Sequence, residues 1–178
     1  LQTTRIGGVS RAPWDAFNLG DHVGDAPDAV AANRALLRRK LPGDPFWLKQ
    51  VHGTVAVDID KWPKIKQGDA AYARQPGNVC AVMTADCLPI LFCDRQGSVV
   101  AAAHAGWRGL LAGVLESAIG AMQVVPGNIL AWLGPAIGPA RVEVGREVRD
   151  VFVAGEPAAG LAFTPRADGH GKWLCDIY

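Results

Sequence analysis

Short apolar runs alternate along the chain with polar turns rich in glycine and proline. Runs of about five mostly apolar residues that end in turn residues are typical of strands, and longer stretches with apolar residues at helical spacing are typical of helices. The pattern predicts strands at residues 46–52, 55–59, 79–84, 88–93, 98–103 and 129–133. It predicts helices at residues 25–39, 107–122 and 142–153. Because the two kinds of element interleave, we expect an α/β fold with a mixed sheet in α/β/α layers.

Length and charge narrow the class of protein. A chain of 178 residues can build one real core, and two full domains would be cramped. The net charge of +1 offers no basic stripe for nucleic acid, and the apolar runs are much shorter than a membrane span. We therefore expect one domain over residues 1–178, a monomer or small oligomer, with no nucleic-acid or membrane partner.

The cysteines do not form a recognisable framework. No pair has the spacing of a zinc ribbon or of a thioredoxin-like redox motif. Scattered cysteines in a chain of ordinary size favour reduced thiols and a cytoplasmic location. The four residues are Cys80, Cys87, Cys93 and Cys175.

Three side chains that bind metals or act as nucleophiles stand at predicted strand ends. They are His52, Cys87 and His104, 35 and 17 residues apart, so only the fold could bring them together. Two imidazoles and a thiolate suit Zn²⁺ with an open fourth position, and they equally suit a Cys–His nucleophilic pair. The spacing does not choose between these two readings. The remaining histidines, His22 and His170, fall in polar loops.

Longer motifs cover nearly the whole chain. They are Thr4-Arg-Ile-Gly-Gly-Val-Ser10, Asn18-Leu-Gly-Asp-His-Val-Gly-Asp25, Asn33-Arg34, Gln50-Val-His-Gly53, Gly68-Asp-Ala70, Thr84-Ala-Asp-Cys-Leu-Pro89, His104-Ala-Gly-Trp-Arg-Gly109, Gly134-Pro-Ala-Ile-Gly-Pro139 and Glu143-Val-Gly145. In these motifs and their order the chain resembles the YfiH family. Members of that family are described as purine nucleoside phosphorylases and as multicopper polyphenol oxidases, or laccase-like proteins.

The resemblance implies a fold, a metal site and a reaction. The fold would be similar to the catalytic domain of cytotoxic necrotizing factor. The family's zinc ligands, which are also its catalytic residues, fall on His52, Cys87 and His104. The implied activity is zinc-dependent phosphorolysis of adenosine, inosine, guanosine or methylthioadenosine, together with adenosine deamination. The small-molecule partners would be a nucleoside and phosphate.

Charged residues of the matched motifs have expected supporting roles. Phosphate is bound by guanidinium groups and by backbone N–H groups at helix starts, so we expect Arg108, Arg34 and Arg5 to contribute to substrate and phosphate binding. Asp86 and Asp69 are expected to orient a ligand histidine or to carry a proton.

Other functions stay open at this point. A four-copper laccase would need about ten histidines, and the chain has four, so polyphenol oxidation could use at most a single copper in the same three-residue site. A Cys87–His104 hydrolase or amidase and a peptidoglycan-editing factor are further alternatives.

Family members also continue past residues 173–178, so we expect the chain to lack the C-terminal part of the family domain.

Overall fold

The centre of the molecule is a five-stranded sheet, seen in a computed structural model that describes residues 1–167 and 171–178. Its strand order is β2 (Ala56–Asp58), β3 (Ala70–Ala73), β6 (Val100–Ala105), β5 (Leu88–Asp94) and β7 (Ile129–Leu133). The pair β2–β3 is parallel, whereas the other neighbours are antiparallel. The predicted mixed sheet and α/β class are confirmed. His170 lies outside the described residues.

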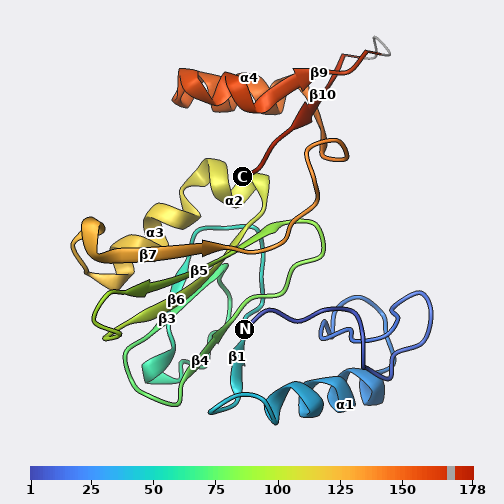
Figure 1. Cartoon of the computed structure of the whole chain (residues 1–178), viewed down its shortest axis with the longest axis vertical. Coiled ribbons are helices and arrows are strands. Elements are labelled where there is room, and N and C mark those ends of the chain that lie inside the picture. The colour runs from blue at the N-terminus through green and yellow to red at the C-terminus, as the bar shows by residue number, and fades with distance from the viewer. Residues whose placement is uncertain (168–170) are drawn as a thin grey trace.

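Two short helices cover one face of this sheet (Figure 1). They are α2 (Trp107–Ala112) and α3 (Val114–Met122), and α3 buries Val114, Ala118 and Met122 against the sheet. The prediction of one continuous helix over residues 107–122 is wrong. Gly113 has φ 94°, a left-handed conformation that ends α2 and lets the chain start α3 in a new direction.

The opposite face is covered by a second, small layer. Strand β1 (Pro45–Trp47) pairs in parallel with β4 (Val79–Ala81), and Phe46 and Ile59 pack there against alternate alanines of β3. A 3₁₀ turn, η1, spans Ile59–Lys61. The strands predicted at 46–52 and 79–84 are thus correct in place but too long, because the chain leaves both strands early to form loops beside the cleft described below.

Helix α1 (Pro27–Arg38) lies next to β1 at the edge of the molecule (Figure 1). Its first turn holds Pro27, which suits that position because its missing N–H has no partner to lose. Only one side of the helix is buried, through Val30, Asn33 and Leu37. The predicted helix at residues 25–39 is confirmed within two residues at each end.

The C-terminal elements form a separate small core. Strand β10 (Lys172–Cys175) pairs with β8 (Glu143–Gly145) and β9 (Phe163–Pro165), and α4 (Arg146–Gly155) packs on them through Val148. Figure 1 shows this unit standing apart from the central sheet. The helix predicted at 142–153 begins late, because its first residues form β8. The 3₁₀ turns η2 (Pro126–Asn128) and η3 (Pro157–Ala162) complete the chain.

Two further expectations concern the state of the cysteines and the presence of a membrane-spanning helix. The four cysteines all lie within the described residues, and each is a free thiol. Among the helices that the structure describes, none is both long and apolar enough to cross a membrane.

Candidate metal centre

The fold brings His52, Cys87 and His104 together. One potential ligand atom from each of the three lies within 4.8 Å of the others. Cys87 directly precedes β5 and His104 stands near the end of β6, and the antiparallel register places Pro89 opposite His104. His52 comes from the loop after β1, where its φ of 58° turns the chain sharply. The predicted convergence of the three residues is therefore present in the structure.

A buried carboxylate holds two of these residues in place. Asp69, directly before β3, has no exposed surface. Its Oδ1 lies 2.8 Å from His104 Nδ1 and accepts the backbone N–H of His52 at 2.9 Å. Its Oδ2 accepts the backbone N–H groups of Val51 at 3.1 Å and Gly53 at 2.8 Å. The expected orienting role of Asp69 thus has a geometric basis, since one side chain fixes both the His52 loop and the His104 ring.

The charge state of this pair follows from its surroundings. Burial alone would raise the pKa of Asp69, but the hydrogen bonds from His104 and the three backbone N–H groups together hold it below its ordinary value. Burial also lowers the pKa of His104, although Asp69 opposes that shift. Asp69 is therefore an ionised acceptor, so His104 must donate through Nδ1. Its Nε2 keeps the free lone pair that a metal would need.

The Cys87 thiol lies close enough to His52 for both side chains to bind one metal ion. Its Sγ is 3.9 Å from His52 Nε2. Burial raises the pKa of the Cys87 thiol, and the charges of Asp86 and Asp69 raise it further. A neutral thiol is a poor nucleophile, whereas a bound cation deprotonates a coordinating thiol outright. The donor set therefore fits a metal better than a free Cys–His nucleophile.

Gly106 leaves space for this arrangement. A Cβ atom at Gly106 would lie 2.7 Å from His52 Cδ2 and 2.9 Å from Cys87 Sγ. Both distances are too short for any side chain, so only glycine allows the imidazole and the thiol to converge here. Sequence reasoning did not single out this residue. The available signal was a glycine between a candidate ligand and a helix start.

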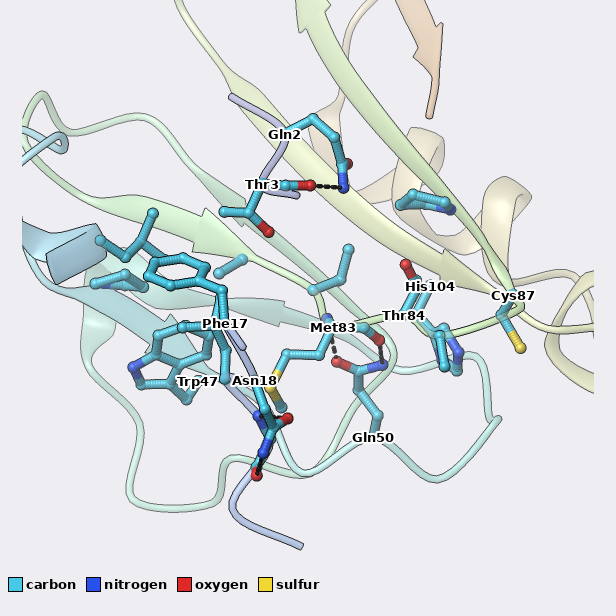
Figure 2. A pocket seen from close by; sticks show the side chains of 18 of the residues that line it. Gln2, Thr3, Phe17, Asn18, Trp47, Gln50, Met83, Thr84, Cys87 and His104 are labelled. Atoms are coloured by element: carbon cyan, nitrogen blue, oxygen red, sulfur yellow. Dashed lines mark hydrogen bonds between the residues drawn. The ribbon is translucent and has the colours of Figure 1, made fainter. Parts of the chain in front are cut away.

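The three residues line one end of a cleft of about 1020 Å³. In Figure 2, Cys87 and His104 lie at that end, and Phe17 and Trp47 lie on the opposite side. Gln50 stands between the two ends. Its amide both donates to the Met83 carbonyl and accepts the Met83 N–H, each at 2.8 Å. The loop that carries His52 is thereby tied to the chain segment that leads to Cys87.

Comparisons with known proteins decide the family. A family model described as multi-copper polyphenol oxidoreductase laccase matches residues 1–178. The purine nucleoside phosphorylase YfiH of Escherichia coli is 55% identical over 179 residues, which cover 99% of this chain and 72% of that protein. The chain belongs to the YfiH family. A purine nucleoside phosphorylase of Pseudomonas aeruginosa is 54% identical over 176 residues, with the same shares of the two chains.

Solved structures support the same assignment for this YfiH-family chain. A Neisseria meningitidis protein matches with a TM-score of 0.94 at 47% identity, over 99% of this chain and 72% of its own. YlmD from Geobacillus stearothermophilus matches with a TM-score of 0.86 at 29% identity, over 98% and 71% of the two chains. The central sheet and its helices are thus an architecture that this chain shares with other members of the family.

The three arginines of the YfiH motifs differ in their position relative to the cleft. Arg5 lines the cleft, and 78% of its side chain is exposed although its Nε donates to the Asp15 carbonyl. Neither Arg34 nor Arg108 is among the described residues that line the cleft. Arg108 is exposed on α2 and stacks over the ring of Trp107. Phosphate contact by these residues stays a prediction, and of the three only Arg5 is among the described residues that line the cleft.

The remaining expected residue, Asp86, is exposed at the rim of the cleft. Its backbone carbonyl accepts the N–H of Ile137 at 3.0 Å, which anchors the segment just before Cys87. Its side chain has open access to solvent, in contrast to the fully buried Asp69. Of the two carboxylates, Asp86 is therefore the one that solvent can reach.

Proposed function

We propose that this YfiH-family protein is a metal-dependent purine nucleoside phosphorylase. The observation that carries the proposal is the convergence of His52, Cys87 and His104 at one end of a cleft large enough for a nucleoside. Relatives that are 50–55% identical carry the name purine nucleoside phosphorylase, including one from Haemophilus influenzae. Nucleosides and phosphate are then the expected substrates.

Zinc is the metal that we propose for the site. Two imidazoles and one thiolate leave a fourth position open, as in zinc sites that bind substrate. When bound, the cation supplies a Lewis acid that polarises an oxygen or lowers the pKa of water to about 7. Copper would accept the same donors, but phosphorolysis involves no electron transfer and so needs no redox-active metal.

The reaction exchanges one bond at the anomeric carbon of the sugar. A phosphate oxygen forms a bond to C1′ while the bond from C1′ to the base nitrogen breaks, and the purine leaves with the electron pair and takes up a proton. Arg5, which lines the cleft, would bind the phosphate dianion through charge-assisted hydrogen bonds. Asp69 keeps His104 in the tautomer that presents Nε2 to the cleft. Asp86 can pass a proton between the cleft and solvent.

Adenosine deamination is proposed as a second activity of the same site. In that reaction water adds at C6 of the base and the amino group leaves as ammonia, so the six-membered ring of adenine, instead of C1′, would face His52, Cys87 and His104. One cleft with a metal end can serve both reactions if the nucleoside binds in two orientations. The cleft, about 1020 Å³ in volume, is large enough for either orientation.

The decisive experiment measures free base released from inosine and adenosine with and without inorganic phosphate. We expect base release to require phosphate, and we expect Cys87→Ser to lower turnover at least about 100-fold. Cys93→Ser is the matched control, because Cys93 lies on β5 outside the cleft lining. Base release that is independent of phosphate, or that survives Cys87→Ser, would contradict the proposal.

One observation favours a second candidate function. The matching family model is described as a polyphenol oxidoreductase, and copper could occupy the same three ligands. Oxygen consumption by the copper-loaded protein with a phenol as the reductant would reveal this activity. Copper-loaded Cys87→Ser should then consume none.

A further inference from the structure

The cleft has a second end, and its chemistry differs from that of the metal centre. We propose that Phe17, Trp47 and Met83 form the subsite for the purine base, and that Arg34 positions Trp47 from outside the cleft. This inference rests on the proposed function, because it specifies where the base of the nucleoside lies. It gives Arg34 a role different from the phosphate contact expected from the sequence.

The three lining residues offer flat and polarisable surfaces. All three are partly exposed and line the cleft. Figure 2 shows Phe17 and Trp47 on the side away from His104 and Cys87, with the Met83 side chain extending toward them. Aromatic rings stack on nucleobases whatever the base, and thioethers make favourable contacts with aromatic rings. A purine fits such a surface better than a phosphate or a sugar would.

Two amide side chains that line the cleft, those of Asn18 and Gln50, are already engaged with the protein. Asn18 Nδ2 donates to the Gly20 carbonyl and to Asp25 Oδ2, and Asn18 Oδ1 accepts the Gly20 N–H at 3.0 Å. Both ends of the Gln50 amide are used by the Met83 backbone. These groups therefore shape the subsite instead of reading the edge of the base. Binding would depend on the faces of the ring, through stacking.

Arg34 fixes the position of Trp47. Its guanidinium carbon lies 4.3 Å from the centre of the Trp47 ring. Its Nε donates to the Leu19 carbonyl at 2.9 Å, and a terminal nitrogen lies 3.4 Å from Asp21 Oδ2. With 22% of its side chain exposed, Arg34 joins α1 to the 19–21 loop and covers one face of Trp47. It is a positioning residue for the wall of the subsite.

The two ends of the cleft are mechanically linked. Gln50 is two residues from His52, and its paired hydrogen bonds hold Met83. A base that stacks at Trp47 and Met83 would thus present its sugar toward His52 and His104. Errors in placement cost catalysis steeply, since a shift of about 1 Å can lower a rate by 10²-fold.

Calorimetric titration of the zinc-loaded protein with adenine tests the subsite. Trp47→Leu should raise the dissociation constant for adenine about tenfold, whereas Trp47→Phe, which keeps an aromatic ring, should recover most of the affinity. Zinc stoichiometry should stay unchanged in both variants. Trp132→Leu is the matched control, because Trp132 is exposed on β7 and lies outside the cleft.

Kinetics separate the two possible roles of Arg34. Arg34→Met should raise KM for inosine several-fold and leave KM for phosphate unchanged, and a selective rise in KM for phosphate would overturn the positioning role. Wild-type adenine affinity in Trp47→Leu would overturn the subsite even if phosphorolysis is observed. If wild type shows no phosphorolysis but binds adenine in a Trp47-dependent way, the subsite is supported and the proposed function fails.

Discussion

Two polar side chains with no exposed surface organise opposite ends of the cleft. Asp69 binds one imidazole and three backbone N–H groups at the metal end. Asn33, in the middle of α1, holds the N-terminal loop that carries Phe17. Its Oδ1 accepts from the Val9 N–H, and its Nδ2 donates to Ser10 Oγ and to the carbonyls of Ala16 and Asn18.

The two residues differ in charge, and the ends of the cleft differ in the same way. Asp69 carries a negative charge that only accepts hydrogen bonds, and it stands behind ligands that would hold a cation. Asn33 is neutral and both donates and accepts, behind a wall of aromatic and apolar side chains. A buried charge costs several kcal/mol to desolvate. It is therefore expected where attraction to a nearby cation offsets that cost. At the apolar end a neutral amide supplies the same mechanical support.

Replacing Asp69 should give the largest effect of any change discussed here. In Asp69→Asn an amide NH₂ would face N–H donors that now bind a carboxylate, and the tautomer of His104 would no longer be fixed. We expect a loss of about 3–5 kcal/mol in the free energy of unfolding, together with the loss of bound zinc. Urea denaturation and metal analysis measure both. A stable Asp69→Asn variant that keeps its zinc would contradict the organising role given to Asp69.

Asn33→Ala should be milder and should spare the metal end. It removes four neutral hydrogen bonds, which predicts a loss of about 2–4 kcal/mol in the free energy of unfolding. Zinc affinity should be retained, while KM for inosine rises because the Phe17 loop is no longer held. Loss of zinc in this variant, measured under conditions where it is folded, would show that Asn33 also supports the metal end.

Gly106→Ala tests the space at the metal end without touching a charge. The added methyl group would collide with His52 and Cys87, and we expect zinc affinity to fall about 10–100-fold. Gly120→Ala is the control, because Gly120 lies in α3 with open space at its Cβ position. That variant should bind zinc normally and gain about 0.5–1 kcal/mol in stability. Equal zinc affinity in the two variants would contradict the geometry of the site.

Two arginines can be compared for their contribution to phosphate binding. Arg5→Met should raise KM for phosphate about tenfold, the loss expected for a hydrogen bond to a charged group. Arg108→Met should raise it less, since Arg108 lies outside the cleft lining. Steady-state kinetics with phosphate as the varied substrate distinguishes the two. A larger effect of Arg108→Met would place the anion on the α2 side of the site.

The smallest effect is the pH dependence of the metal-free protein. The pKa of His104 is lowered in the folded state, so the unfolded state binds the proton first and stability falls as pH drops below its ordinary value of 6.5. The slope should be at most about 1.4 kcal/mol per pH unit. The lowered pKa of Asp69 adds a further loss at lower pH. His104→Gln should lack the first decline, as urea titrations between pH 5 and about 8 would show.

The fold was predictable where sequence patterns are strong and local. The apolar runs of β5, β6 and β7 and the periodicity of α1 predict those elements correctly. Strand β3 gives no such signal, because three of its four residues are alanine, which is uncommon in strands. Gly113 does not by itself predict a break in the helix expected at 107–122, since a single glycine is often tolerated within a helix. Only its left-handed φ shows the break.

The candidate metal ligands could be predicted from the sequence, but the residues that hold the walls of the cleft in place could not. The resemblance placed three potential ligands that the sequence separates by 35 and 17 residues, and spacing alone could not have joined them because their meeting depends on strand register. The role of Asn33 was invisible, since a polar residue within a helix is usually solvated and its partners come from a distant irregular loop. The same applies to Arg34, whose place behind Trp47 depends on how α1 meets β1.

Zinc binding to the chelator-treated protein tests the central claim most directly. Competitive titration should show one zinc ion bound per chain, an equal stoichiometry in Cys93→Ser, and at least about 100-fold weaker binding in Cys87→Ser. Phosphorolysis of inosine should return as zinc is added back to the wild type. Tight zinc binding by Cys87→Ser, or full activity of wild-type protein that holds no metal, would contradict the metal centre proposed for His52, Cys87 and His104.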